Sequence, residues 1–177
     1  MDGLAAALAR AGNADVVVTS GGASVGDHDL VRPALDAWGA EIDFWRVAIK
    51  PGKPLLVARR GAQWVLGLPG NPVSSYVTAF LFLLPLLRAL AGADSSSVLP
   101  RAIEARIDSP LPATGDRREF VRAFYENGTV RPLGQQDSSA LRALAECNAL
   151  IDRKPNSPEA PAGEAVWLYL LENGGIA

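Results

Sequence analysis

Three short turns in the first half of the chain carry the residue types that could hold an anion. They are Ser20-Gly21-Gly22-Ala23-Ser24-Val25-Gly26, Lys50-Pro51-Gly52-Lys53-Pro54 and Leu68-Pro69-Gly70-Asn71-Pro72-Val73-Ser74. Lysine ammonium groups and the backbone N–H groups at helix N-termini both attract phosphate and other oxyanions. Any one such turn is equally compatible with a plain connection, but three of them within one domain favour a binding site.

The third turn has the signature of a helix start. Gly70 tolerates backbone angles closed to other residues, Asn71 is a good N-cap, and Pro72 suits the first helical position because its missing N–H costs nothing there. We expect the free N–H groups of this helix, with a partial positive charge of roughly half a unit, to face the turn. Lys50 and Lys53 would add charge beside it.

Two better-known phosphate motifs are absent. Gly21 and Gly26 have the glycine spacing of a P-loop, but Asp27 and His28 stand where the lysine and the Ser/Thr belong, and no glycine spacing matches the dinucleotide fingerprint. The absence of both motifs therefore argues against an ATPase or a nicotinamide-dependent enzyme. Asp27 and Asp29 could bind Mg²⁺, because hard cations prefer carboxylate oxygen, or could cap the helix that follows.

The elements that must position these turns alternate between helical patterns and short β-rich runs, which predicts a parallel α/β layer over residues 1–92. Each glycine-rich turn follows an apolar run, so both would lie at the carboxyl ends of strands, where open α/β sheets bind ligands. The expected helices are 3–12, 28–39 and 72–91, and the expected strands are 15–19, 42–48, 55–59 and 64–68.

Beyond residue 92 the pattern changes. A polar linker is expected over 93–100, followed by a C-terminal domain over 101–177 with strands at 102–107, 119–125 and 164–171 and a short helix around 138–146. Short strands with alternating apolar residues predict a small β barrel or sandwich.

Composition narrows the function classes. The formal net charge is −2 and no basic patch lies outside the lysine turn, so nucleic acid is a poor partner. The single cysteine, Cys147, excludes an internal disulfide and follows an apolar helical pattern, so we interpret it as a packing residue. The run Val77–Leu87 is shorter than the ~20 residues needed to cross a bilayer. We expect it to be a buried helix whose hydrogen bonding Pro85 disturbs near residue 81.

The ordered motifs resemble one family, the MoeA-type molybdopterin molybdenumtransferases, which include the E domain of gephyrin. The resemblance rests on Asp15 to Gly26, Phe44 to Pro54 and Gly67 to Ser74. It continues through Arg117 with Phe120 and Arg122, Gln136 with Ser138, and Asn148-Ala149-Leu150-Ile151. The fold it implies is a three-layer molybdopterin-binding α/β domain followed by a small all-β domain.

The resemblance also implies a reaction and a set of site residues. Molybdate would be inserted into adenylylated molybdopterin with a divalent cation, Mg²⁺, and AMP would be released. Asp29 would be the catalytic or metal-associated carboxylate and Lys50 a catalytic, substrate-contacting residue. The molybdate pocket would comprise Lys50, Lys53, Pro54, Arg117 and Ser138. Further substrate contacts would come from Gly21, Gly22, Ser24, Arg46, Lys53, Pro69, Gly70, Asn71, Pro72 and Ser74.

The resemblance further implies that the chain begins within a domain, lacking its first strand and helix and two preceding domains. We therefore expect little or no turnover by this chain alone, and a cytoplasmic homodimer whose partners could include the molybdopterin adenylyltransferase. Two alternatives stay open: a non-catalytic module that dimerises or docks on a partner, and the adenylyltransferase itself. The C-terminal β part and the turn Lys50 to Pro54 argue against the latter.

Overall fold

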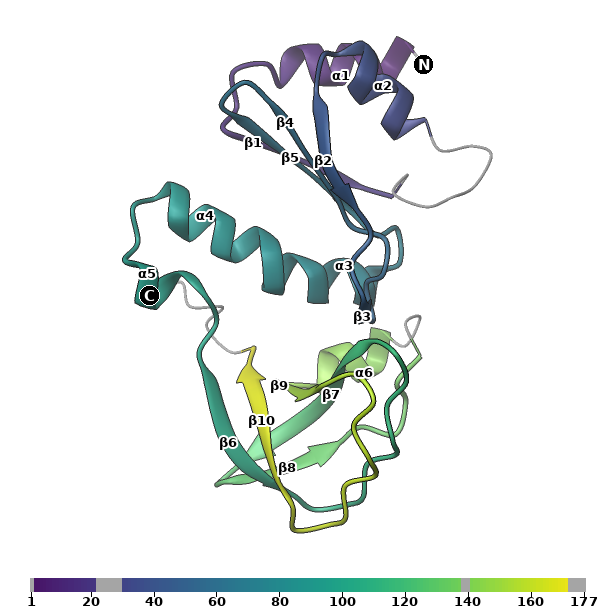
Figure 1. Cartoon of the computed structure of the whole chain (residues 1–177), viewed down its shortest axis with the longest axis vertical. Helices are drawn as coiled ribbons and strands as arrows, with labels where there is room; N and C mark the ends of the chain where they lie inside the picture. Colours follow the sequence, from purple (N-terminus) through teal and green to yellow (C-terminus); the bar gives the residue numbers. More distant parts are fainter. Residues whose placement is uncertain (1, 22–29, 138–140, 172–177) are drawn as a thin grey trace.

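The computed structural model describes residues 2–21, 30–137 and 141–171. Its two parts are an α/β unit and, beneath it, a β barrel, joined by the segment that runs from α4 through α5 to β6 (Figure 1). The α/β unit comprises α1 (Asp2–Arg10), β1 (Val16–Ser20), α2 (Val31–Ala37), β2 (Glu41–Trp45), β4 (Leu56–Arg60), β5 (Gln63–Leu68), α3 (Pro72–Thr78), η1 (Ala79–Leu83) and α4 (Leu84–Leu90).

The expected parallel sheet is a mixed sheet. Within the described residues its strand order is β1-β5-β4-β2; β1 pairs with β5 in parallel, whereas β4 pairs antiparallel with both β5 and β2. Only two residues, Gly61 and Ala62, separate β4 from β5. A parallel pair needs a crossover of a dozen or more residues, so this connection dictates a hairpin.

Helices cover both faces of this sheet, which gives the expected three layers. On one face Leu8 of α1 and Leu35 of α2 pack against Leu56, Ala58 and Val65 of the sheet. On the other face the buried residues Val57 and Leu66 are covered by the helical run that starts at Pro72; its contacts are Ala79, Phe82, Leu83 and Leu86. The α/β fold class is therefore confirmed.

The run from Pro72 to Leu90 is one continuous helix with a π-helical segment, η1, in its middle. Proline has no N–H to donate to the carbonyl four residues earlier, so Pro85 leaves the hydrogen bonding irregular around residue 81, as predicted. By length and composition alone this helix could span a membrane, with 19 residues and a mean hydropathy of 1.7. Its length is therefore no argument against a membrane span, contrary to the sequence-based expectation.

Contacts on two sides cover part of the apolar surface of this helix, whereas Leu87 and Leu90 near its end are exposed. Phe82 and Leu83 contribute to the sheet cluster, whereas Val77 and Phe80 pack with Phe120 and other residues of the barrel. The helix thus lies between the two parts of the molecule, as Figure 1 shows.

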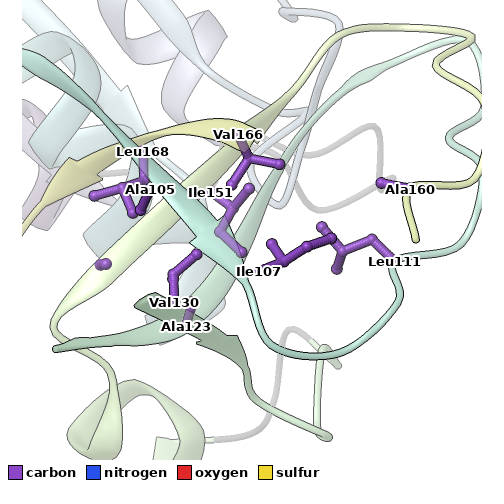
Figure 2. Packing of buried hydrophobic residues seen from close by; sticks show 10 residues of the cluster. Ala105, Ile107, Leu111, Ala123, Val130, Ile151, Ala160, Val166 and Leu168 are labelled. Atoms are coloured by element: carbon purple, nitrogen blue, oxygen red, sulfur yellow. The ribbon is translucent and has the colours of Figure 1, made fainter. Parts of the chain in front are cut away.

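The second part of the molecule is a closed barrel. Its elements are α5 (Ser95–Val98), β6 (Ala102–Ile107), β7 (Arg118–Glu126), β8 (Thr129–Pro132), α6 (Leu141–Glu146), β9 (Ala149–Arg153) and β10 (Ala165–Leu170). The order β7-β8-β6-β10-β9 returns to β7 through the β7–β9 pairing. Figure 2 shows side chains from these strands, among them Val130, Ile151 and Leu168, filling the interior. The predicted small β domain is confirmed; β8 and β9 are strands that the sequence pattern did not reveal.

Between β2 and β3 (Ile49–Lys50) the chain passes from the first sheet to the barrel sheet. The expected strand 42–48 ends at Trp45, and the chain re-enters a sheet only at β3, which pairs in parallel with β7 of the barrel sheet. Arg46 causes the break: its φ of 104° lies in the left-handed region, so the backbone leaves the extended conformation there. The lysine turn is therefore hydrogen-bonded to both parts.

Candidate anion-binding site

The first and third glycine-rich turns lie against each other at the carboxyl ends of β1 and β5. Gly21 N–H donates to Leu68 C=O at 3.1 Å, and a β-carbon placed on Gly70 would stand 3.3 Å from Gly21 Cα. Gly21 also has a φ of 85°. Small residues are required because the two backbones touch. The predicted contacts Gly22, Ser24 and Asp29 lie outside the described residues.

The helix after the third turn begins as predicted, but its first N–H groups are engaged. Asn71 is the N-cap, and its Oδ1 accepts hydrogen bonds from the N–H groups of Val73 at 3.1 Å and Ser74 at 3.3 Å. Ser75 N–H donates to Asn71 C=O, and Pro72 has no N–H. The free donors expected here for an anion are therefore satisfied within the protein, and attraction of an anion falls to basic side chains.

The lysine turn packs against the same helix further along. Gly52 has a φ of 112°, and a β-carbon built on it would stand 2.5 Å from Thr78 Cγ2 and 3.2 Å from Ile49 Cδ1. Thr78 is fully buried. The turn is thus held at the end of α3, with Pro51 and Gly52 buried and Lys53 exposed.

Three of the predicted cationic residues come together in one pocket at the seam of the two parts. The pocket has a volume of about 540 Å³ and is lined by Arg46, Val47, Ala48, Lys53, Asp116 and Arg117. Arg46 and Lys53 come from the segment around β3, and Arg117 directly precedes β7. Three basic groups and one carboxylate leave an excess of positive charge, which suits an oxyanion with two negative charges.

The backbone beneath this pocket is fixed by hydrogen bonds. Arg46 N–H donates to Leu55 C=O at 2.9 Å, and Val47 N–H donates to Lys53 C=O at 3.0 Å. From the barrel, Arg118 N–H donates to Ala48 C=O at 3.0 Å. These bonds set the distance between the lysine turn and the Arg117 loop, so the basic groups are positioned by both parts of the molecule.

Arg46 occupies this pocket at a cost in backbone energy. A non-glycine residue with positive φ stores of order 1–3 kcal/mol, and the φ of Arg46 is 104°. Its guanidinium carbon lies 4.7 Å from the centre of the Trp45 ring, and that of Arg32 lies 4.3 Å from the same ring. The stacking limits where the Arg46 side chain can go.

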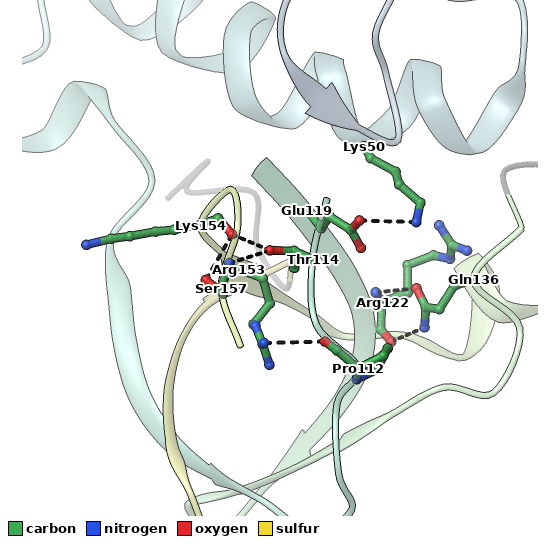
Figure 3. A network of polar contacts seen from close by, with 9 residues as sticks. All are labelled: Lys50, Pro112, Thr114, Glu119, Arg122, Gln136, Arg153, Lys154 and Ser157. Carbon is green, nitrogen blue, oxygen red and sulfur yellow. Dashed lines mark hydrogen bonds and ion pairs between the residues drawn. The ribbon is translucent and has the colours of Figure 1, made fainter. Parts of the chain in front are cut away.

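Lys50 does not line this pocket. Its Nζ lies 3.2 Å from Glu119 Oε1, and Figure 3 shows the pair joining the lysine turn to β7. The backbone brings them together, because Lys50 and Glu119 are register partners in the β3–β7 pairing. Of the three cations expected in the molybdate pocket, Lys53 and Arg117 share this pocket with Arg46, which was expected as a further substrate contact, whereas Lys50 is paired with a carboxylate.

The loop that leads to Ser138 is bonded to β7, although Ser138 itself lies outside the described residues. Gln136 Oε1 accepts from Arg122 N–H at 3.0 Å and its Nε2 donates to Arg122 C=O at 2.9 Å (Figure 3). The fully buried Arg122 side chain donates from Nη2 to the carbonyls of Gln135 and Asp137. Burial lowers the pKa of the Arg122 guanidinium.

The remaining predicted residues shape the turns. Pro69 and Ser74 are buried, Pro72 is the first residue of α3, and Pro54 is half-buried next to Lys53. Sequence reasoning missed Asp116 and Glu119. A signal existed in both cases, since each carboxylate lies within two residues of the predicted Arg117.

Within the described residues, no group of three or more His, Cys, Asp or Glu side chains could hold a metal ion. The predicted Mg²⁺ site depends on Asp29, which the structure does not describe.

Comparisons with known proteins match both parts of the chain. Residues 1–89 match the family model described as a probable molybdopterin binding domain, and residues 104–171 match that of the MoeA C-terminal region (domain IV).

Individual relatives agree with this. A molybdopterin molybdenumtransferase of Haemophilus influenzae is 36% identical over 166 residues, which cover 91% of this chain and 41% of the relative. The molybdenum cofactor synthesis protein cinnamon of Drosophila melanogaster is 38% identical, covering 85% of this chain and 26% of the relative.

The solved structure of a molybdopterin biosynthesis MoeA protein from Pyrococcus horikoshii superposes with a TM-score of 0.78 at 27% identity, covering 96% of this chain and 41% of that one. This chain thus spans well under half the length of these relatives. This chain belongs to the family described as a probable molybdopterin binding domain, and its second part belongs to the MoeA C-terminal region.

Proposed function

We propose that this chain provides the oxyanion-binding part of a molybdopterin molybdenumtransferase. In the reaction, molybdate is inserted into adenylylated molybdopterin and AMP is released. The observation that carries the proposal is the pocket in which Arg46, Lys53 and Arg117 meet between the two parts of the molecule. The match covers 41% of the Haemophilus influenzae relative, so the transferase activity of a full-length protein is likewise a proposal for this chain.

The residues would divide the work by charge and position. Molybdate is a tetrahedral dianion, and Lys53 and Arg117 would hold it from opposite sides of the seam by charge-assisted hydrogen bonds. Arg46, fixed by its stacking on Trp45, would add a planar guanidinium that can hold two oxygens at once. Lys50 would contact the substrate. Tungstate has the same shape and charge, so this pocket should discriminate weakly between the two.

The proposal extends to the surroundings of the site. Mg²⁺ is expected as the divalent cation, with Asp29 as its carboxylate ligand. We further propose that the protein is cytoplasmic and acts as a homodimer away from membranes and nucleic acid, with the adenylyltransferase as a possible supplier of its substrate. Little or no turnover is expected from this chain alone.

Two binding measurements test the proposal. Molybdate and adenylylated molybdopterin would each be titrated into the whole chain at near-physiological salt, alongside Lys53→Ala and Arg117→Ala. Each loses one charge-assisted contact, so molybdate affinity should fall about ten- to a hundredfold. Arg10→Ala is the matched control, because it removes one exposed charge in α1 on the far layer of the first part. Absence of binding by the unmodified chain would favour the non-catalytic docking module.

The barrel argues against the adenylyltransferase alternative. Residues 104–171 match the MoeA C-terminal region, and this region supplies Arg117 to the pocket from the loop just before β7. A function that required only the α/β part would leave this arrangement without a role.

A further inference from the structure

We propose that Glu119 is a positioning residue that competes with the substrate anion for Lys50. In the ligand-free protein it would hold the Lys50 ammonium outside the pocket of Arg46, Lys53 and Arg117, and so limit the capture of small oxyanions. This inference rests on the proposed function, because that function assigns Lys50 to the substrate.

The first support is that the pairing is built into the backbone. Lys50 and Glu119 are 69 residues apart in sequence yet occupy partner positions of β3 and β7. On its other side, Glu119 is the register partner of Arg153 in the β7–β9 pairing. The Arg153 guanidinium donates to the carbonyls of Pro112 and Pro158, so it is the backbone pairing with β9 that fixes Glu119 from this side. The carboxylate is thereby kept in place beside the lysine turn.

The second support is the difference in burial between the partners. The Lys50 side chain is 48% exposed, whereas that of Glu119 is 20% exposed. The carboxylate is thus the fixed member of the pair, and the lysine, with its long flexible stem, is the member that can move. An anion entering the pocket meets a lysine that can change partners without any movement of the backbone.

The third support is charge. The pocket already has an excess of positive charge without Lys50. A fourth free cation would strengthen attraction to any small oxyanion in the cell. Pairing with Glu119 offsets that attraction, and a larger substrate with several negative charges competes for Lys50 more effectively than a single small anion. Glu119 would therefore contribute to selectivity rather than to chemistry.

A double-mutant cycle tests this inference. The dissociation constants of molybdate and sulfate would be measured for the whole chain, Glu119→Gln, Lys50→Ala and the double variant. Glu119→Gln keeps the side-chain size and removes the charge. It should bind both anions about two- to fivefold more tightly, the range expected for a half-exposed ion pair. In the Lys50→Ala background the same change should have little effect.

Three results would overturn the inference: unchanged or weaker anion binding by Glu119→Gln, an equal gain with and without Lys50, or no detectable anion binding by any variant. An equal gain would mean that Glu119 acts on the anion only through its general charge. Circular dichroism spectra and thermal unfolding of all four proteins would show that each is folded. Titration with adenylylated molybdopterin separates the two proposals. If the tightening for molybdate and sulfate is seen but the pterin does not bind, the proposed function fails; the competition of Glu119 with small anions for Lys50 then holds, and its role toward the substrate falls with that function.

Discussion

Thr78 Cγ2 lies 2.5 Å from the point where a β-carbon on Gly52 would stand. The lysine turn can therefore approach α3 only with glycine at this position, and its φ of 112° imposes the same requirement. The closeness of these two residues fixes the depth at which Lys53 and Lys50 are presented at the seam.

Gly52→Ala should displace the lysine turn. The overlap and the positive φ together should lower the free energy of unfolding by about 2 to 4 kcal/mol, as measured by urea denaturation. Molybdate affinity should fall as well. Thr78→Ser removes the overlapping methyl group and keeps the hydroxyl that donates to Ser74 C=O, so the double variant should regain part of the stability. No recovery in the double variant would contradict a steric cause.

Arg46 offers a way to separate backbone strain from charge. Arg46→Ala and Arg46→Gly both remove the guanidinium, so both should weaken molybdate binding equally. They should differ in stability, because only glycine adopts a φ of 104° without strain. We expect the free energy of unfolding of Arg46→Gly to be about 1 kcal/mol larger than that of Arg46→Ala. Equal stabilities would show that the positive φ costs little.

Asn71 should contribute to stability as the N-cap of the long helix. Asn71→Ala leaves the N–H groups of Val73 and Ser74 without their side-chain acceptor, and should lower the free energy of unfolding by about 1 kcal/mol. Asn71→Asp keeps an acceptor at the same place and serves as the control. A full effect of the alanine variant with an unchanged aspartate variant would identify the cap as the cause.

Sequence reasoning succeeded where the signal was local. Asn71 followed by Pro72 specifies a helix start through properties of those two residues, and Pro85 disturbs the helix through its own missing N–H. Neither depends on distant parts of the chain, and the structure shows both features.

The mixed sheet was missed although a local signal was present. The expected strands 55–59 and 64–68 leave a connection far too short for a parallel crossover. Alternation of helical and strand patterns in the rest of the domain suggested parallel pairing throughout. The short loop between the strands 55–59 and 64–68 nevertheless indicates an antiparallel pair.

The division of the cations could not have been predicted in the same way. Glu119 engages Lys50 only because the chain leaves the first sheet after β2 and pairs with β7 of the barrel sheet through β3. That pairing joins segments 69 residues apart, and no property of either segment alone specifies the partner. The motifs drew attention to these residues but could not indicate which of them would share a pocket.

Cys147 gives a prediction for the dependence of stability on pH. The residue packs into the cluster between α3 and the barrel, as expected from its sequence pattern, and burial raises the pKa of its thiol. Because the pKa of the thiol in the folded protein lies above its value of about 8.5 in the unfolded chain, the stability gained from burying the neutral thiol is fully present below pH 8.5. The contribution is lost as pH rises through the folded pKa, because the unfolded chain releases its proton first.

Urea unfolding between pH 7 and 9.5 should therefore show declining stability, with a shallower decline in Cys147→Ala. Burial also raises the pKa values of Tyr76 and Tyr169, but both tyrosines are present in the two proteins, so the difference between the two slopes reports on Cys147. Identical slopes for the two proteins would exclude Cys147 as a source of the pH dependence.

Two side-chain amides act as strand partners for β7, and one of them precedes the predicted Ser138. Asn148 accepts from Tyr125 N–H at 2.7 Å and donates to Tyr125 C=O at 2.9 Å, and Gln136 makes the same pair of bonds with Arg122. A carboxylate can accept in this arrangement but cannot donate. It would remove one of the two hydrogen bonds to the Arg122 carbonyl, leaving the one from Leu133 N–H at 2.9 Å, and would place a negative charge beside that carbonyl.

Gln136→Glu should therefore be at least as destabilising as Gln136→Ala, for which a loss of about 1 to 3 kcal/mol is expected. The charged variant should regain stability in acid, where a protonated carboxyl can donate again, and the alanine variant should not. Urea denaturation at pH 4.5 and 7.5 would measure the difference. Parallel behaviour of the two variants at both pH values would mean that the amide only fills space, and that the loop before Ser138 is held by Arg122 alone.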